Sequence, residues 1–180
     1  MAPRLTGATL VALAALAAAP TASASWRATV DSLYSSAERQ LELGNHRPAS
    51  ALYARTLETI SAHDGATGDA YLAGLAARSA FLRGRSLEHL ERWDDAAAAY
   101  LEALPRLPAV TDAVLFRLGR CYRKSGDLEG AVAVLREIIG DTEVGGFDLP
   151  ARESLGDAYY DADDGLSAMQ WYESMLAVAS

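Results

Sequence analysis

The fold is decided by the stretch LFRLGRCYRKSGDLEGAVAVLREII, residues 115–139. Each half of it carries small or apolar side chains at helical spacing: Leu115, Leu118, Gly119 and Tyr122, then Ala131, Leu135, Ile138 and Ile139. Such spacing gives a helix one apolar face. Between the halves, Gly126 can end one helix in the left-handed conformation and Asp127 can cap the next. The stretch therefore predicts two helices that pack as a hairpin.

The same columns recur at four places along the chain, which indicates an internal repeat. Small anchor residues stand at Ala37, Gly84, Gly119 and Gly156. Twelve residues after each anchor stands an alanine: Ala49, Ala96, Ala131 and Ala168. Four residues further on stands a large side chain: Tyr53, Tyr100, Leu135 and Tyr172. We expect the anchor to admit the second helix closely and the large side chain to fill the space between successive hairpins.

These columns resemble the tetratricopeptide repeat family. The resemblance is carried by three motifs: Arg92–Ala96 with Tyr100, Ala103, Leu104 and Pro108; Leu118–Tyr122 with Gly126 and Ala131; and Leu155–Tyr159 with Ala168 and Tyr172. It implies an all-α, right-handed solenoid of about four hairpins, at about residues 26–62, 67–108, 111–140 and 149–179. The anchors are 47, 35 and 37 residues apart, against about 34 in the family. We assign the extra length after the first hairpin to a loop at His63–Asp69.

Residues 1–24 have the features of a secretory signal peptide. Arg4 gives a positive start, residues 10–19 are apolar, and Ala22-Ser23-Ala24 fits a cleavage site. An apolar run of about ten residues is too short to span about 30 Å of hydrocarbon as a helix. We therefore expect an exported bacterial protein, periplasmic or secreted, that starts at about Ser25 and has no stable membrane insertion after cleavage. The alternative is an uncleaved N-terminal anchor.

Charge and cysteine content exclude several classes of function. The formal charge of −8 becomes −9 without residues 1–24, which hold Arg4 and no acid. A chain this acidic is repelled by phosphate backbones, so we expect no nucleic-acid partner. The single cysteine, Cys121, excludes an internal disulfide and a thiolate-rich metal site. It falls among core columns of a helix and is expected to be a small apolar filler.

The sequence offers no catalytic, cofactor or metal motif. It contains no nucleophile elbow, no zinc-protease motif and no glycine-rich phosphate loop. Its histidines, His46, His63 and His89, include no i, i+4 pair. The segment Asp161–Gly165 lacks the glutamate that a calcium loop needs at its twelfth position, and is expected to be a hairpin turn with a capping acid. We therefore expect no enzyme and no cofactor.

The resemblance implies a binding surface, because the first helices of tetratricopeptide hairpins line a concave groove that receives ligands. Mapped onto this sequence, the groove-facing residues of the middle hairpins are Arg78, Phe81, Arg85, Phe116, Arg117, Arg120, Arg123 and Lys124. We call these eight residues the basic strip. Forked arginine contacts could hold an acidic or C-terminal carboxylate peptide there. The clamp of lysine and asparagine found in chaperone-binding relatives is not supported, since Tyr34 and Glu38 occupy those places.

Two alternatives stay open. The basic strip could be neutralised internally by flanking acids: Glu38, Glu42, Glu153, Asp157 and Asp161. The last hairpin could also leave apolar side chains bare, namely Trp171, Met175 and Leu176. We therefore expect a scaffold that binds a protein or peptide, and as the alternative a structural subunit that forms homo-oligomers through the last hairpin.

Overall fold

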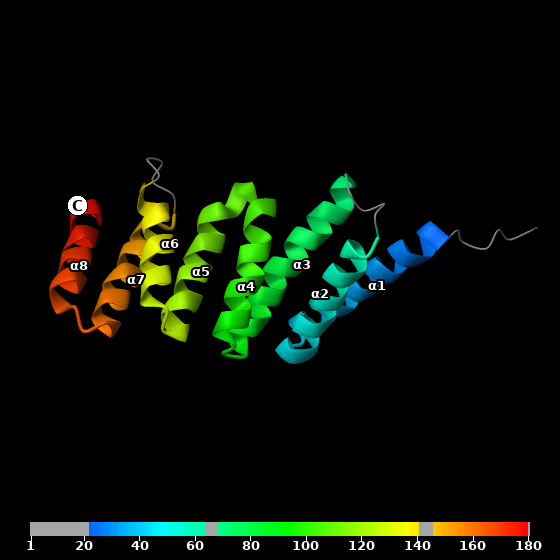
Figure 1. Cartoon of the computed structure of the whole chain (residues 1–180), viewed down its shortest axis with the longest axis horizontal. Coiled ribbons are helices and arrows are strands. Elements are labelled where there is room, and N and C mark those ends of the chain that lie inside the picture. Colours follow the sequence, from blue (N-terminus) through cyan, green and yellow to red (C-terminus); the bar gives the residue numbers. More distant parts are fainter. Residues whose placement is uncertain (1–21, 64–67, 141–145, 180) are drawn as a thin grey trace, which may run out of the picture.

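The computed structural model describes residues 22–63, 68–140 and 146–179. These residues form α-helices and short turns, with no strand among them (Figure 1). The α-helices are α1 (Ala22–Glu42), α2 (His46–Ser61), α3 (Ala70–His89), α4 (Trp93–Ala103), α5 (Thr111–Ser125), α6 (Leu128–Gly140), α7 (Asp148–Asp161) and α8 (Gly165–Ala179). Two single turns of 3-10 helix, η2 (Leu104–Arg106) and η3 (Pro108–Val110), join α4 to α5. Most of the predicted signal peptide, residues 1–21, lies outside the described residues.

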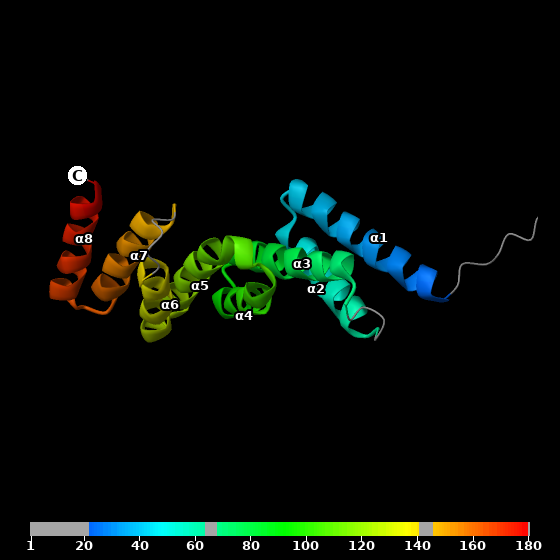
Figure 2. The same ribbon diagram turned by 90° about the horizontal axis from the view of Figure 1, so that it is seen from above.

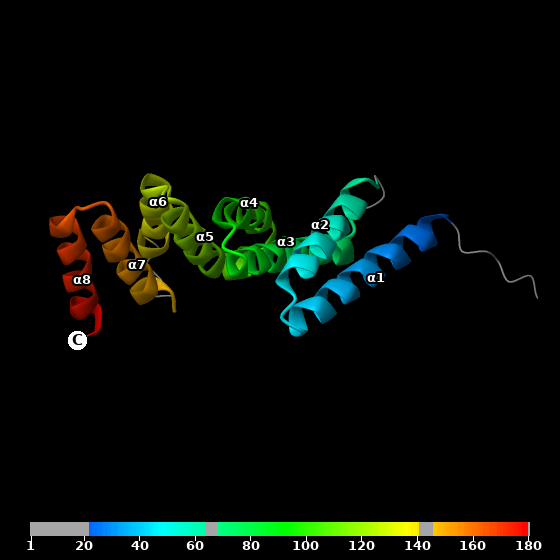
Figure 3. The ribbon, with the colours of Figure 1, turned by 90° about the horizontal axis from the view of Figure 1, so that it is seen from below.

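The helices pair into four hairpins that follow one another along a row. Helices α1 and α8 lie at opposite ends of an elongated body, and each helix packs chiefly on its neighbours in sequence (Figures 1, 2 and 3). The turns inside the hairpins all lie along one edge, the lower edge in Figure 1. This arrangement confirms the predicted all-α solenoid. Among the described residues, no helix is both long and apolar enough to cross a membrane.

The small anchors allow the two helices of a hairpin to touch. A Cβ atom added at Gly119 would lie 2.6 Å from Cγ of Leu135, and one added at Gly84 would lie 2.8 Å from the Tyr100 ring. Real side chains do not approach so closely, so these positions on the first helix must remain glycine for the second helix to pack as it does. The close approach predicted from the columns is confirmed.

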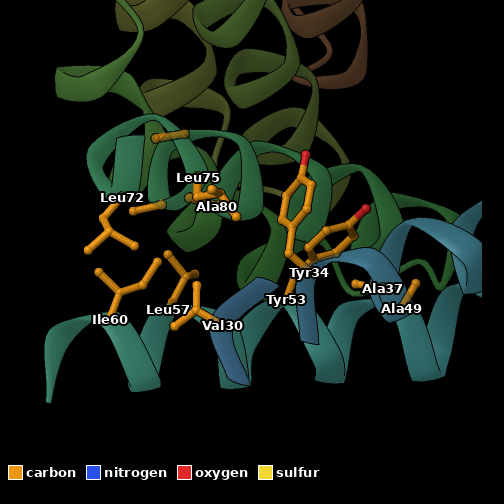
Figure 4. Close-up of a cluster of buried hydrophobic side chains, with 12 residues drawn as sticks. Val30, Tyr34, Ala37, Ala49, Tyr53, Leu57, Ile60, Leu72, Leu75 and Ala80 are labelled. Atoms are coloured by element: carbon orange, nitrogen blue, oxygen red, sulfur yellow. The ribbon is translucent and has the colours of Figure 1, made fainter. Parts of the chain in front are cut away.

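The large side chains of the columns also reach the next hairpin. Tyr53 joins a cluster with Leu72 and Leu75 of α3 (Figure 4). Leu135 joins one with Leu155 of α7. The expectation that these side chains fill the space between hairpins is thus confirmed, except at Tyr172 of α8, which is 37% exposed. No further hairpin follows α8 among the described residues to cover it.

Turn residues end and begin the helices where the sequence predicts. Gly126 closes α5 at φ 89°, and the Asp127 carboxylate accepts a hydrogen bond from the Gly130 amide at 2.9 Å. Glycine adopts this left-handed conformation without steric cost. In the segment read as a turn and not as a calcium loop, Asp164 accepts a hydrogen bond from the Ser167 amide at 3.1 Å, which confirms the capping acid.

Candidate peptide-binding surface

The basic strip lies on two first helices of neighbouring hairpins. Helix α3 carries Arg78, Phe81 and Arg85, and helix α5 carries the rest: Phe116, Arg117, Arg120, Arg123 and Lys124. The two helices meet through the Arg117 guanidinium, which lies 5.8 Å from the centre of the Phe81 ring. The structure therefore brings the two halves of the predicted strip together at this point.

Arg117 is neutralised from within the protein. Its Nη1 atom lies 3.3 Å from Glu88 on α3, an acid that the sequence reasoning did not include among the flanking carboxylates. The same carboxylate accepts a hydrogen bond from the buried hydroxyl of Tyr100. Burial, followed by the charge of Glu88, raises the pKa of Tyr100, so this hydroxyl stays protonated and donates. Arg117 is therefore part of an internal network between α3, α4 and α5.

Arg123 is also neutralised, by two of the predicted flanking acids. Its Nη1 atom lies 2.7 Å from Asp157 and 3.4 Å from Asp161, both on α7. The side chain is only 15% exposed. Internal pairing therefore accounts for Arg123 as well as Arg117.

The other four cations of the strip differ from Arg117 and Arg123. Among the described residues, no carboxylate forms an ion pair with Arg78, Arg85, Arg120 or Lys124. Arg120 lies 6.0 Å from the centre of the Phe116 ring, a contact that leaves its positive charge uncompensated. On α1, Glu38 interacts with the Tyr34 hydroxyl, whose pKa is raised by burial and then by this acid. The strip is thus only partly neutralised.

A small surface pocket of about 270 Å³ opens beside the strip. Its lining residues are Arg85, Glu88, His89, Trp93, Arg117 and Arg120. The His89 ring stacks on His46 of α2, with centroids 4.1 Å apart and planes 10° from parallel. Sequence spacing alone treated these histidines as scattered. The repeat could have predicted their proximity, because both histidines lie at the turns inside successive hairpins and these turns share one edge of the solenoid.

The predicted self-association residues differ in exposure. Trp171 and Met175 are partly buried; Trp171 packs against the third core cluster and lies 5.8 Å from the Arg136 guanidinium. Leu176 is 73% exposed. Leu166 and Met169, which the sequence reasoning did not name, are also exposed on α8.

Cys121 is fully buried against the second core cluster. Burial, with a smaller effect of Glu88, raises the pKa of its thiol to about 12. The thiolate is the form that acts as a nucleophile or metal ligand, and burial keeps this thiol protonated. This agrees with the expected role of an apolar filler. Among the described residues, no group of histidine, cysteine and acidic side chains could hold a metal ion.

Comparison with known proteins gives one family match and several shared folds. The tetratricopeptide repeat family model matches residues 113–141. No curated protein matches the sequence at a significant level. The structure is similar to that of MamA, residues 41 to the end, from Desulfovibrio magneticus RS-1, at 15% identity over 83% of this chain and 75% of that chain, with a TM-score of 0.64.

Two further solved structures share the fold. BtubC from P. vanneervenii is 17% identical over 83% of this chain and 63% of its own, with a TM-score of 0.62. A Podosopora anserina protein with nearly identical TPR-like repeats is 14% identical over 84% of this chain and 95% of its own, with a TM-score of 0.50. The family model thus matches one tetratricopeptide repeat, at residues 113–141, and the solved structures share the solenoid fold of the chain.

Proposed function

We propose that this protein is an exported scaffold that binds an acidic protein or peptide along the basic strip. The observation that carries the proposal is the unequal neutralisation of the strip. Arg117 and Arg123 are paired internally, whereas Arg78, Arg85, Arg120 and Lys124 have no acidic partner among the described residues. A surplus of positive charge on one surface of a protein with net charge −8 favours a partner that brings carboxylates.

Export is a second part of the proposal and depends on residues 1–24. Its support is the charged start, the short apolar run and the Ala-Ser-Ala sequence before Ser25. Expression of the full chain, followed by N-terminal sequencing of the protein in the envelope fraction, tests it. A mature protein that begins near Ser25 supports export and cleavage, and an intact N-terminus in the cytosolic fraction contradicts them.

The binding surface can be tested by affinity capture from an envelope extract with three baits. The first is the unaltered chain from Ser25. The second carries Arg78→Glu, Arg120→Glu and Lys124→Glu, which reverse charges of the strip without breaking an ion pair among the described residues. The third carries Arg39→Glu, Arg47→Glu and Arg55→Glu on α1 and α2, which change the net charge equally outside the strip.

We expect the first and third baits to retain the same proteins and the second bait to lose them. Loss from both variants would assign retention to net charge alone. Equal retention by all three baits would remove the strip from the binding surface. Circular dichroism of each bait checks that the substitutions leave the helical fold intact.

A second candidate function is self-association through α8. It is favoured by the exposure of Leu166 and Leu176, which are 74% and 73% exposed on the last helix. Sedimentation velocity over a range of concentrations measures the mass. If copies associate through this face, Leu166→Glu with Leu176→Glu abolishes the larger species, whereas Arg55→Glu leaves it unchanged. A single monomeric species at all concentrations would reject this candidate.

A further inference from the structure

A second surface with the features of a binding site lies between the second helices of the last two hairpins. Helix α7 lies between α6 and α8 (Figures 1 and 2) and packs on both of them. The first helices α5 and α7 also contact each other, whereas no comparable contact joins α6 to α8. The two second helices are therefore separated, and α7 forms the floor between them.

Two adjoining pockets occupy this space. One, of about 280 Å³, is lined by Leu128, Glu129, Val132, Ala158, Tyr159 and Ala162. The other, of about 290 Å³, is lined by Arg136, Tyr159, Ser167, Gln170, Trp171 and Ser174. Tyr159 of α7 lines both pockets, so they are two halves of one groove. We call the residues that line them the α6–α8 groove.

The α6–α8 groove lies away from the basic strip. Asp157 of α7 pairs with Arg123 of the strip at 2.7 Å. Tyr159 follows Asp157 by two residues, and each residue of an α-helix turns by about 100°, so the two side chains leave α7 about 200° apart. A ligand of the groove and a ligand of the strip would therefore contact different faces of this helix.

Arg136 is held in the groove without an acidic partner. Its Nη2 atom donates a hydrogen bond to the Tyr159 hydroxyl at 2.9 Å, and its guanidinium lies 5.8 Å from the centre of the Trp171 ring. Among the described residues, no carboxylate forms an ion pair with it. Glu129, the only acid among the described lining residues, stands seven residues earlier on α6, about 10 Å along the helix. Since a guanidinium has several N–H donors in one plane, Arg136 can bind an anion while it keeps its bond to Tyr159.

The other half of the groove is apolar. Its walls come from Leu128 and Val132 on α6 and from Ala158 and Ala162 at the end of α7. Val132 precedes Arg136 by one turn of α6, so the apolar pocket and the guanidinium are about 6 Å apart along the helix. In an extended peptide, side chains two residues apart lie on the same side at a spacing of about 7 Å. The groove therefore matches an apolar side chain and an acidic side chain separated by one residue.

We propose that the α6–α8 groove binds an extended segment of a partner protein, with an apolar side chain in the pocket at Val132 and an acidic side chain, two residues away, on Arg136. The guanidinium holds the carboxylate through charge-assisted hydrogen bonds, and the Trp171 ring adds apolar surface beside it. This inference goes beyond the proposed function, because the basic strip selects acidic segments by charge, whereas the groove also requires an apolar side chain. The scaffold would then bind partners through two faces of different chemistry.

The test uses the indole of Trp171 as a reporter of binding. The chain contains three tryptophans, Trp26, Trp93 and Trp171, so a two-dimensional N–H NMR spectrum gives one indole signal for each. Trp93 lines the pocket beside the basic strip, and Trp26 lies on α1. Trp171→Phe and Trp93→Phe assign the signals. The protein is the chain from Ser25, which retains all described residues except 22–24.

The probe is the peptide acetyl-Ala-Leu-Ala-Glu-Ala-amide, which has no charged terminus. We expect it to shift the Trp171 signal saturably and to leave the Trp26 and Trp93 signals in place. A peptide with glutamine in place of glutamate is expected to bind about tenfold more weakly, because it lacks the charge that Arg136 holds. A peptide with serine in place of leucine is also expected to bind about tenfold more weakly, because it buries less apolar surface.

Two variants of the chain test the two halves of the groove. Arg136→Gln is expected to weaken binding of the glutamate peptide about tenfold, so that the glutamate and glutamine peptides bind equally. Ala162→Glu, at the exposed rim of the apolar pocket, is expected to weaken binding of both peptides by obstructing the leucine. Arg55→Gln, the matched control at an exposed arginine of the second helix α2, is expected to change neither affinity.

The outcomes separate this inference from the proposed function. A Trp171 signal that does not move at millimolar peptide, or that moves equally with the glutamine or serine peptide, overturns the groove. A shift of Trp93 that Arg120→Gln abolishes, with Trp171 unmoved, assigns the peptide to the basic strip and rejects the groove. In the chain with Arg78→Glu, Arg120→Glu and Lys124→Glu, we expect the Trp171 titration to be unchanged, and a loss of binding there would refute a site independent of the strip.

Discussion

The contact between Gly119 and Leu135 makes a sharp prediction about stability. Both residues are buried, and a Cβ at position 119 would meet Cγ of Leu135 at 2.6 Å and Cδ2 at 2.8 Å. Overpacking in a closed core costs about 1–3 kcal/mol. Alanine, however, stabilises a helix interior by about 1 kcal/mol relative to glycine. Gly119→Ala should therefore change the free energy of unfolding by the difference of these two effects.

Gly74→Ala is the matched control that separates them. Gly74 also lies inside a helix, α3, but a Cβ there would meet nothing within 4 Å. This substitution should raise the free energy of unfolding by about 1 kcal/mol. Subtracting the change in unfolding free energy of Gly74→Ala from that of Gly119→Ala cancels the helix preference of alanine and leaves the cost of overpacking. We expect Gly119→Ala to be less stable than Gly74→Ala by about 1–3 kcal/mol.

The assay is urea unfolding followed by circular dichroism at 222 nm. The free energies of unfolding are compared between variants for which they depend on the urea concentration with the same slope. In a Leu135→Ala background the clash is gone, and Gly119→Ala should then stabilise the protein by about 1 kcal/mol. The reasoning is refuted if Gly119→Ala stabilises the chain as much as Gly74→Ala does while Leu135 is present.

Four other substitutions or treatments probe separate features. Burial raises the pKa of the Cys121 thiol to about 12, so this thiol should react with a disulfide reagent at about pH 8 only after urea unfolds the chain. Equal rates of thiol modification with and without urea would contradict its burial. Gly126→Ala should lower the free energy of unfolding by about 1 kcal/mol, because φ there is 89°; an unchanged urea midpoint would show that the turn tolerates a side chain. Glu88→Ala should cost about 1–3 kcal/mol in urea unfolding by stranding a buried tyrosine hydroxyl, whereas the exposed Glu129→Ala should be near neutral. Asp69 caps α3, and the hydrogen bond from the Leu72 amide lowers the pKa of its carboxyl. The stabilising effect of this carboxylate is therefore present above the unfolded pKa of about 3.9 and is lost as pH falls through the folded value. The melting temperatures of Asp69→Ala and of the unaltered chain should differ at neutral pH and converge in acid.

The fold could be predicted because its central contact is local and repeated. A glycine at 84 or 119 and a large residue sixteen positions later form one contact across one hairpin, so the sequence displays both partners at a fixed interval. The 3-10 turns between α4 and α5 were not predicted. They are each three residues long, too short to show a hydrophobic period, and only Pro105 and Pro108 mark them.

The candidate surface could be predicted in its location but not in its pairing. Asp157 and Asp161 stand in columns of the next first helix, so their approach to Arg123 follows from the repeat. Glu88 lies at the end of the preceding first helix, and its contact with Arg117 depends on how far one hairpin slides along the next. Side-chain packing determines this displacement of one hairpin along the next, and the pattern of a single sequence does not predict it.

Packing between sequence neighbours has a mechanical consequence. A force that draws the two ends of the molecule apart passes through every hairpin in series, since α1 and α8 share no contact surface among the described residues. Helix α8 packs chiefly on α7, so its release would leave the other hairpins in place. Its 15 residues would lengthen from about 1.5 Å to about 3.4 Å per residue, an extension of roughly 30 Å. The second and third hairpins, which carry the basic strip on α3 and α5, would still be folded at that extension.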